Sequence, residues 1–420
     1  MENPKKDSKA FSASAKVSFD DAWNFIMKVG LAAHKYGATS GRLEFLLKGL
    51  AQDFGYKGNF KSTPVEIRFG LQETTDAPKR AEVLATPPSN IDLDKLARLG
   101  DVLNEINAGT LSLNDAAPRI DAIDQIPPPW GKFPSMLGYV FTGFGFALLL
   151  GAGWTDTLLA AVFSLIVYGI VLLSPRLGTT AVKWMPLTSA LVVGFLSGLI
   201  KHWVPDLNLV LVILCGVIML LPGYAISLGT GELVTKQVKS GLYNLKSGLT
   251  ALVKQIAGAI IGVRLASVFV TIGAEAPQAP VDPKWIILFF PLLLVGLALA
   301  FQVPRRDLAW SVLVSAIAYL GVLGGSSIMN ANLGNLLGTI LAVIVGSLWS
   351  LKTSRPASIV VMPAILLLVG GTIGFRGLAT MASGNMVLGL EQFFQMFIVA
   401  LTIMVGVLIG LFIMRPKPNL

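Results

Sequence analysis

Two short pairs of helix-breaking residues stand at matching places in apolar sequence. Pro222-Gly223 and Gly370-Gly371 each fall near the end of a long uncharged stretch. Proline lacks the backbone N–H donor and glycine weakens a helix, so both pairs predict positions where a helix unwinds. Unwound backbone at membrane depth is tolerated only where it lines a cavity or is covered by protein. The pairs are therefore our first candidates for a polar binding site; a kink that serves only packing is the alternative.

Three charged residues join these pairs as candidates. Arg264 is expected near the middle of an apolar segment, where an arginine costs about 2.5–3.5 kcal/mol on insertion scales. It should face the protein interior, either to bind a carboxylate or to pair with Glu232 or Glu391. Glu232 follows the Pro-Gly pair, and Glu391 begins the last apolar segment. These two glutamates are the acidic groups placed best to bind and release a proton.

The composition excludes several classes of protein. Hydrophobic residues make up 54% of the chain and charged residues only 14%, against about 25% charge in soluble domains. One cysteine, Cys215, and two histidines rule out a disulfide framework and argue against a metal site. The sequence contains neither a P-loop nor a nucleophile–base set, so we expect no enzyme activity, no cofactor and no ATP-driven step. Residues 1–133 hold 17 basic and 17 acidic residues, and their zero net charge argues against nucleic acid as a partner.

The remaining sequence predicts ten membrane spans. A bilayer requires roughly 20 mostly apolar residues per helix. The uncharged stretch 308–351 is too long for one helix. Its middle, from Gly324-Gly325-Ser326-Ser327 through Asn330-Ala331-Asn332, predicts a turn. The segment 249–272 is apolar although it carries Lys254 and Arg264. The predicted spans lie near 135–153, 157–174, 185–200, 207–227, 249–272, 285–302, 308–324, 333–351, 357–374 and 391–414.

The distribution of basic residues predicts the orientation of these spans. With residues 1–133 in the cytoplasm, the loops on that side hold 11 basic residues. The opposite side then holds three, Lys201, Lys284 and Arg376. Basic residues concentrate in cytoplasmic loops, so both termini are predicted to be cytoplasmic and the chain to be a multi-pass membrane protein.

The spans also repeat. The shift in numbering that carries Gly223 onto Gly371, called the repeat offset below, also maps position 137 to 285, 160 to 308, 185 to 333 and 209 to 357. The expected membrane repeats are residues 134–272 and 273–420, with five spans in each. An odd number of spans per repeat places the two repeats in opposite orientations. Such inverted repeats are typical of secondary transporters, with a site near the midplane where broken helices meet. A channel or a membrane enzyme is the alternative.

Residues 18–133 predict a soluble α/β domain, preceded by a disordered tail over 1–17. Helices are expected from Ser18, over Thr39–Asp53, near 92–108 and over 112–125. Strands are expected at 65–69 and 82–85. The domain ends in Pro127-Pro128-Pro129-Trp130, a stiff linker.

The chain resembles the bacterial threonine/serine exporter family from about residue 20 onward. The residues that carry the resemblance are Tyr36-Gly37-Ala38-Thr39-Ser40-Gly41-Arg42-Leu43-Glu44, Leu50-Ala51, Gly55, Leu221-Pro222-Gly223, Glu232-Leu233, Ser240-Gly241 and Ile373-Gly374-Phe375-Arg376-Gly377-Leu378. The family often has Pro-Gly in the second half, whereas this chain has Gly370-Gly371.

The resemblance implies a proton-driven transporter in the bacterial inner membrane that exports threonine, serine and related small amino acids. An amino-acid zwitterion requires acceptors for its ammonium and donors for its carboxylate, and the two broken helices would supply both. Glu232 and Glu391 would then be the candidates for proton coupling. Its expected partners are these amino acids, protons and membrane lipid, and homo-oligomerisation is left open. The alternatives are a receptor or scaffold that signals through its cytosolic domain, and a transporter of another small polar metabolite.

Overall fold

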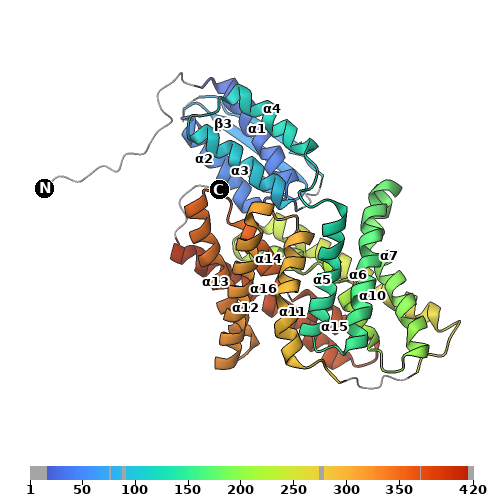
Figure 1. Ribbon diagram of the computed structural model, residues 1–420. Coiled ribbons are helices and arrows are strands. Elements are labelled where there is room, and N and C mark those ends of the chain that lie inside the picture. Colours follow the sequence, from blue (N-terminus) through green and yellow to red (C-terminus); the bar gives the residue numbers. More distant parts are fainter. Residues whose placement is uncertain (1–16, 75–76, 88–90, 274–278, 369, 415–420) are drawn as a thin grey trace. The chain divides into compact units, whose positions relative to one another are not determined.

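The computed structural model describes residues 17–74, 77–87, 91–273, 279–368 and 370–414. The chain divides into two compact units (Figure 1). One contains the described residues up to Pro128 together with Leu348–Ala357. The other contains Pro129–Ser347 and Ser358–Met414. The expected disordered tail lies, apart from residue 17, outside the described residues.

The N-terminal unit packs four helices with a small antiparallel sheet. In the sheet, β3 lies between β4 on one side and β1 and β2 on the other. The predicted helices and both predicted strands are present; β1 and β2 were not foreseen. The elements are α1 (Phe19–Lys35), α2 (Ser40–Asp53), β1 (Lys57–Gly58), β2 (Lys61–Thr63), β3 (Glu66–Gln72), β4 (Arg80–Ala85), α3 (Leu93–Asn107) and α4 (Leu113–Gln125).

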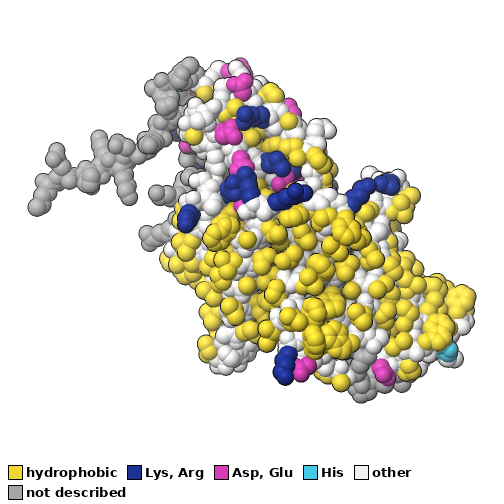
Figure 2. Space-filling view, viewed as in Figure 1, with side chains coloured by type: hydrophobic (Ala, Val, Ile, Leu, Met, Phe, Trp, Pro, Cys, Tyr) yellow, Lys and Arg dark blue, Asp and Glu magenta, His cyan; other side chains and the backbone are white. Residues whose placement is uncertain are grey.

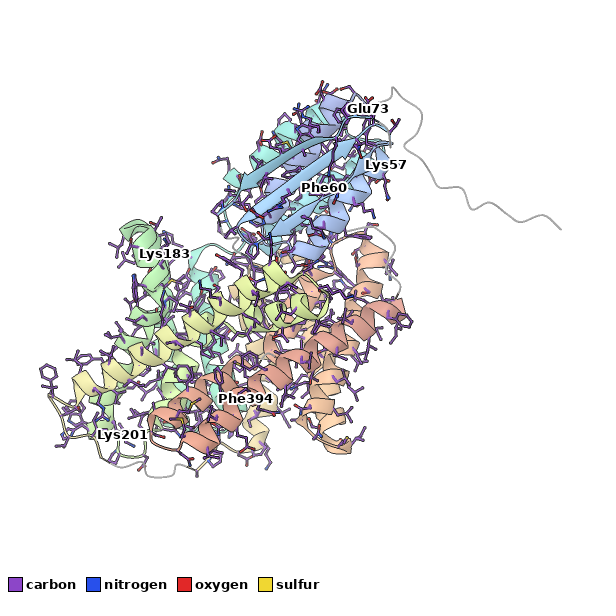
Figure 3. All side chains as sticks on the ribbon, turned by 180° about the vertical axis from the view of Figure 1, so that it is seen from behind. Lys57, Phe60, Glu73, Lys183, Lys201 and Phe394 are labelled. Carbon is purple, nitrogen blue, oxygen red and sulfur yellow. The ribbon has the colours of Figure 1, made fainter. Side chains whose placement is uncertain are left out.

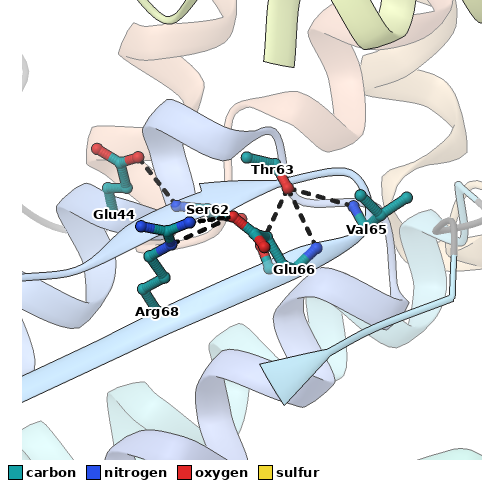
Figure 4. Close-up of polar contacts among 6 residues, drawn as sticks. All are labelled: Glu44, Ser62, Thr63, Val65, Glu66 and Arg68. Atoms are coloured by element: carbon teal, nitrogen blue, oxygen red, sulfur yellow. Dashed lines mark hydrogen bonds and ion pairs between the residues drawn. The ribbon is translucent and has the colours of Figure 1, made fainter. Parts of the chain in front are cut away.

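Local hydrogen bonds explain why these elements begin and turn where they do. The hydroxyl of Ser18 accepts from the backbone N–H of Asp21 at 3.1 Å and caps α1, as its sequence position predicts. At the β2–β3 turn, the hydroxyl of Thr63 accepts from the backbone N–H of Glu66 (Figure 4). The carboxylate of Glu44 accepts from the backbone N–H of Ser62 and ties α2 to β2. This domain therefore has its own hydrogen-bonded frame around a buried apolar core.

The second unit is a bundle of helices. Its described elements include three 3₁₀ turns, and two of its apolar stretches are each divided into two helices, α8 and α9 in one and α14 and α15 in the other. The elements are α5 (Lys132–Leu149), α6 (Trp154–Leu173), η1 (Ser174–Leu177), α7 (Thr179–Trp203), α8 (Leu209–Gly216), η2 (Ile218–Leu220), α9 (Gly223–Val234), α10 (Val238–Ala266), α11 (Pro283–Ala300), η3 (Arg305–Asp307), α12 (Leu308–Ile328), α13 (Ala331–Thr353), α14 (Ser358–Leu368), α15 (Gly371–Ala382) and α16 (Met386–Met414).

These helices make the chain a polytopic membrane protein. Within the described residues, eight helices are long and apolar enough to cross a membrane, and a ninth span results if the bent pair α8 and η2–α9 counts as one. Helix α5 is not among these nine candidate spans, so the tenth predicted span remains a prediction. Figure 2 shows a face of this unit that is covered mostly by hydrophobic side chains, as contact with lipid requires.

Two predicted boundaries are wrong. The turn expected from Gly324 through Asn332 is present but shorter, because α12 continues through Gly324-Gly325-Ser326-Ser327 to Ile328 and α13 begins at Ala331. Gly325 serves close packing, since a Cβ there would lie 2.7 Å from the Cα of Gly334 in α13, whereas nothing lies within 4 Å of a Cβ on Gly324. Helix α10 begins at Val238 and ends at Ala266, so the expected span 249–272 is displaced toward the C-terminus. This displacement changes the position of Arg264, described below.

Helices related by the repeat offset have matching lengths and contacts. Helices α9 and α15 each have 12 residues, and α10 and α16 each have 29, and both pairs start at equivalent positions. A Cβ on Gly229 would lie 2.9 Å from the carbonyl oxygen of Gly241. In the second half, a Cβ on Gly377 would lie 2.9 Å from the carbonyl oxygen of Gly389, the residue at the equivalent position. The α9–α10 and α15–α16 pairs therefore approach through equivalent glycines.

Glycine packing yields a prediction about stability. A Cβ on Gly346 in α13 would overlap the side chain of Val361 in α14, whereas nothing lies within 4 Å of a Cβ on Gly169 in α6. We expect Gly346→Leu to lower the thermal transition of the detergent-solubilised protein and its folded yield. Overpacking a close helix contact typically costs about 1–3 kcal/mol.

The matched control is Gly169→Leu, which adds the same side chain at an exposed helix position. This control should keep the parental transition within a few degrees. Equal transitions for the two variants would contradict a packing role for Gly346.

Candidate functional site

Both predicted helix breaks are present. Helix α8 gives way to the 3₁₀ turn η2, and α9 begins at Gly223 with Pro222 at its N-cap. The chain bends by 60° at this break. Helix α15 begins at Gly371 with Gly370 at its N-cap. Helices α14 and α15 follow each other within one apolar stretch, Ser358–Ala382.

The two breaks touch. A Cβ on Gly371 would lie 3.1 Å from the Cα of Gly223 and 3.2 Å from its backbone nitrogen. That spacing is tighter than most real Cβ contacts, so any side chain at position 371 would push the Gly223 backbone away by a few tenths of an ångström. The structure thus brings together Pro222-Gly223 and Gly370-Gly371, two pairs that lie far apart in the sequence. Their binding of substrate stays a prediction.

The contact joins the N-terminal ends of two helices. The first N–H groups of a helix have no intrahelical acceptor, and the end carries a partial positive charge. Helices α9 and α15 both begin here. The preceding helical segments end here too, with carbonyl groups that lack intrahelical donors. One small region therefore offers donors for an anionic group and acceptors for a cationic one.

Helix α10 lines the first break. A Cβ on Gly248 would lie 3.5 Å from the carbonyl oxygen of Pro222. Two turns further along, the side-chain Nε2 of Gln255 donates to the carbonyl oxygen of Leu220 at 2.8 Å. Gln255 is fully buried, and its Oε1 has no hydrogen-bond partner within the described chain. The sequence analysis missed Gln255 because it considered only charged groups and helix breakers.

Helix α16 lines the second break with apolar side chains. A Cβ on Gly370 would lie 3.2 Å from the Val399 side chain, and a Cβ on Gly374 would overlap the sulfur of Met396. Met396 and Val399 are both almost fully buried. The wall of the second break is therefore apolar where the wall of the first carries an amide.

Two candidate residues lie elsewhere. Arg264 lies in the last turn of α10, and its side chain is exposed rather than turned into the bundle. The expectation that it sits mid-span is wrong, because α10 ends at Ala266. Glu391 is also exposed, near the start of α16. The structure brings neither residue to the two breaks.

Glu232 is buried near the end of α9. Its Oε2 accepts from the side-chain amide of Asn244 in α10 at 2.7 Å. At the equivalent positions of the second half, the hydroxyl of Thr380 donates to the side-chain oxygen of Gln392 at 3.1 Å. The two hydrogen bonds join equivalent positions with opposite donor directions, and only the first pair contains a titratable group.

Further charged residues of the described bundle are buried or half-buried, among them Arg376, Lys201 and Asp156. Arg376, expected in a loop, is half-buried in α15. Lys201 is buried at the end of α7 and donates to the carbonyl oxygens of Pro205 and Leu207 at 2.6 and 2.8 Å. The buried carboxylate of Asp156 accepts from the backbone N–H of Asn208 at 3.1 Å. Lys201 and Asp156 therefore stabilise the connection between α7 and α8. The described part of the chain contains no cluster of three or more His, Cys, Asp or Glu residues suited to a metal ion.

Comparison with known proteins identifies sequence relatives. A family model described as "putative threonine/serine exporter" matches residues 24–266, and a second, described as "threonine/serine exporter, ThrE", matches residues 286–413. An uncharacterised protein of Schizosaccharomyces pombe is 25% identical over 84% of this chain and 48% of its own length. A probable threonine/serine exporter of Mycobacterium tuberculosis is 24% identical over 82% of this chain and 66% of its own.

A pheromone-regulated membrane protein 10 of Yarrowia lipolytica is 23% identical over 87% of this chain and 31% of its own length. The chain thus spans about a third to two thirds of the length of these three relatives. No solved structure matches the chain. Both breaks lie inside the matched regions, one in each.

Proposed function

The chain belongs to the threonine/serine exporter family, and on this premise we propose that it exports threonine, serine and related small amino acids from the cytoplasm, driven by the proton gradient. The observation that carries the proposal is the contact between Gly223 and Gly371 at the starts of α9 and α15. Two converging helix N-termini inside a membrane bundle suit the carboxylate of an amino acid. The carbonyl ends of the preceding segments suit its ammonium.

The two membrane halves act as inverted repeats in this proposal. The support is the single repeat offset that relates both helix bounds and glycine contacts in the two halves. With five spans per repeat and α5 as the first span, the two breaks would approach the membrane midplane from opposite faces of the membrane. Rocking of one repeat against the other would then open the shared site to each side in turn.

A transport assay tests the proposal directly. In proteoliposomes loaded with unlabelled threonine, we expect labelled threonine to enter by counterflow. We expect Gly371→Ala to reduce counterflow about tenfold or more, because the added methyl group fills the gap beside Gly223 and a misplaced binding group often costs about 10²-fold. Gly223→Leu, which adds a larger side chain at the same contact, should abolish it.

The control is Gly169→Ala, which adds a methyl group in open space. This variant should transport at the parental rate. Absence of counterflow with any small amino acid would favour a receptor or scaffold role, and counterflow of a different polar metabolite alone would change the substrate. Parental transport by Gly371→Ala would remove the breaks from the site.

We further propose that the protein lies in a bacterial plasma membrane with both termini in the cytoplasm. Lys183 and Lys201 mark opposite ends of α7 (Figure 3). The basic excess is on the Lys183 side, which the positive-inside rule assigns to the cytoplasm.

Cysteine labelling checks this orientation. In a Cys215→Ala background, a cysteine replacing the exposed Met329 between α12 and α13 should react with an impermeant thiol reagent added to whole cells. A cysteine replacing the exposed Lys352 near the end of α13 should react only after permeabilisation. The reverse pattern would refute the orientation, and equal reactivity of both sites in whole cells would refute α13 as a span.

Glu232 is our proposed proton-coupling residue, in preference to Glu391. It is buried within the bundle and hydrogen-bonded to Asn244, whereas Glu391 is exposed. A buried carboxyl group can exchange a proton as its surroundings change between the two access states. The equivalent Thr380 cannot titrate, so this role belongs to the first repeat alone.

The glutamine variants test this assignment. Glu232→Gln keeps an acceptor for Asn244 but cannot bind and release a proton. It should lose threonine accumulation driven by an imposed pH gradient and keep counterflow, which requires no net proton movement. Glu391→Gln, the exposed counterpart, should keep both activities. Full uphill accumulation by Glu232→Gln would contradict the assignment.

A further inference from the structure

The two breaks share their backbone features but differ in one side chain. By the repeat offset, Gln255 of α10 corresponds to Ile403 of α16, and Gly248 corresponds to Met396. All four residues are buried. A small residue and an amide therefore line the first break, where two bulky apolar residues occupy the equivalent positions at the second.

The Gln255 amide is held in one orientation. Its hydrogen-bond partner is the carbonyl oxygen of Leu220, an acceptor, so the atom that faces it must be the donor Nε2. Leu220 ends η2, two residues before Pro222. The Oε1 atom is consequently directed away from that carbonyl group, beside the break, and has no partner in the described chain.

A buried carbonyl oxygen without a donor is unfavourable, and most buried polar atoms have at least one partner. A ligand that supplies a donor would satisfy Oε1. On the α10 side of the break, Gly248 contributes no side chain, and the atoms nearest to a Cβ placed there would include the Ile226 side chain at 2.8 Å and the carbonyl oxygen of Pro222 at 3.5 Å. On the α16 side, the Met396 side chain is packed against Gly374 at the equivalent position.

We propose that Oε1 of Gln255 accepts a hydrogen bond from the side-chain hydroxyl of the transported amino acid. This assignment rests on the proposed export function and specifies its selectivity. Every amino acid carries a carboxylate and an ammonium, which match the helix ends present at both breaks. A group present at only one break suits the part of the substrate that differs between amino acids.

The apolar residues at the second break are consistent with this assignment. Met396 and Val399 offer no hydrogen bond to a substrate side chain, and they suit the methyl group of threonine. Selectivity for hydroxy amino acids would then depend on Gln255. A substrate without the hydroxyl would leave Oε1 buried and unpaired, and sites built to hydrogen-bond a hydroxyl reject such analogues strongly.

Counterflow with matched substrates tests the proposal. We compare threonine with 2-aminobutyrate, in which hydrogen replaces the hydroxyl group, in proteoliposomes that contain the full-length protein. The parental protein should half-saturate with threonine at a concentration about tenfold or more below that for 2-aminobutyrate. Gln255→Met, similar in length but with no amide, should remove most of this preference. The loss should come from a higher half-saturating concentration for threonine, while the half-saturating concentration for 2-aminobutyrate should change by about twofold or less.

Ile403→Met is the matched control, since it alters the equivalent buried position of the second half and should keep the threonine preference. Equal use of both substrates by the parental protein would overturn the proposal without any variant. A Gln255→Met protein that retains the preference, or that loses both substrates equally while remaining folded, would also overturn it. Equal loss of both substrates would mean that Gln255 binds the substrate ammonium group or only holds the carbonyl group of Leu220. Transport of neither substrate by the parental protein would instead refute the export function.

Discussion

The interior of a membrane offers no water to unpaired backbone groups, and this constraint governs the bundle. A helix can end within it only where other protein groups or a bound ligand satisfy the exposed donors and acceptors. In this chain, one break is placed against another. The contact between Gly223 and Gly371 depends on the absence of a side chain on Gly371, and it places the starts of α9 and α15 side by side.

The surrounding helices follow from that contact. Close glycine packing of α9 on α10 and of α15 on α16 sets the direction of each short helix. Helix α10 can then extend Gln255 to the carbonyl group of Leu220, while α16 covers the second break with apolar side chains. In the proposed function, the matching backbone of the two halves provides the place for a zwitterion. The differences between their side chains would provide selectivity and proton coupling. Glu232 and Gln255 both belong to the first half.

The sequence predicted what depends on local backbone chemistry. Pro222-Gly223 and Gly370-Gly371 identified both breaks, and Ser18 identified the start of α1. Some features that depend on packing were not predicted. The turn between α12 and α13 begins after Gly324-Gly325 because Gly325 packs against α13, and Arg264 was misplaced because α10 starts within a basic segment. Gln255 is uncharged and lies inside an apolar helix, so only its hydrogen bond to Leu220 distinguishes it from other buried residues.

The most direct test of the central claim is an experimental structure of the protein with threonine bound. The substrate carboxylate is predicted to lie within hydrogen-bond distance of the N–H groups at the starts of α9 and α15, with the hydroxyl on Oε1 of Gln255. Threonine bound elsewhere in the bundle, with Gly223 and Gly371 still in van der Waals contact, would contradict the account.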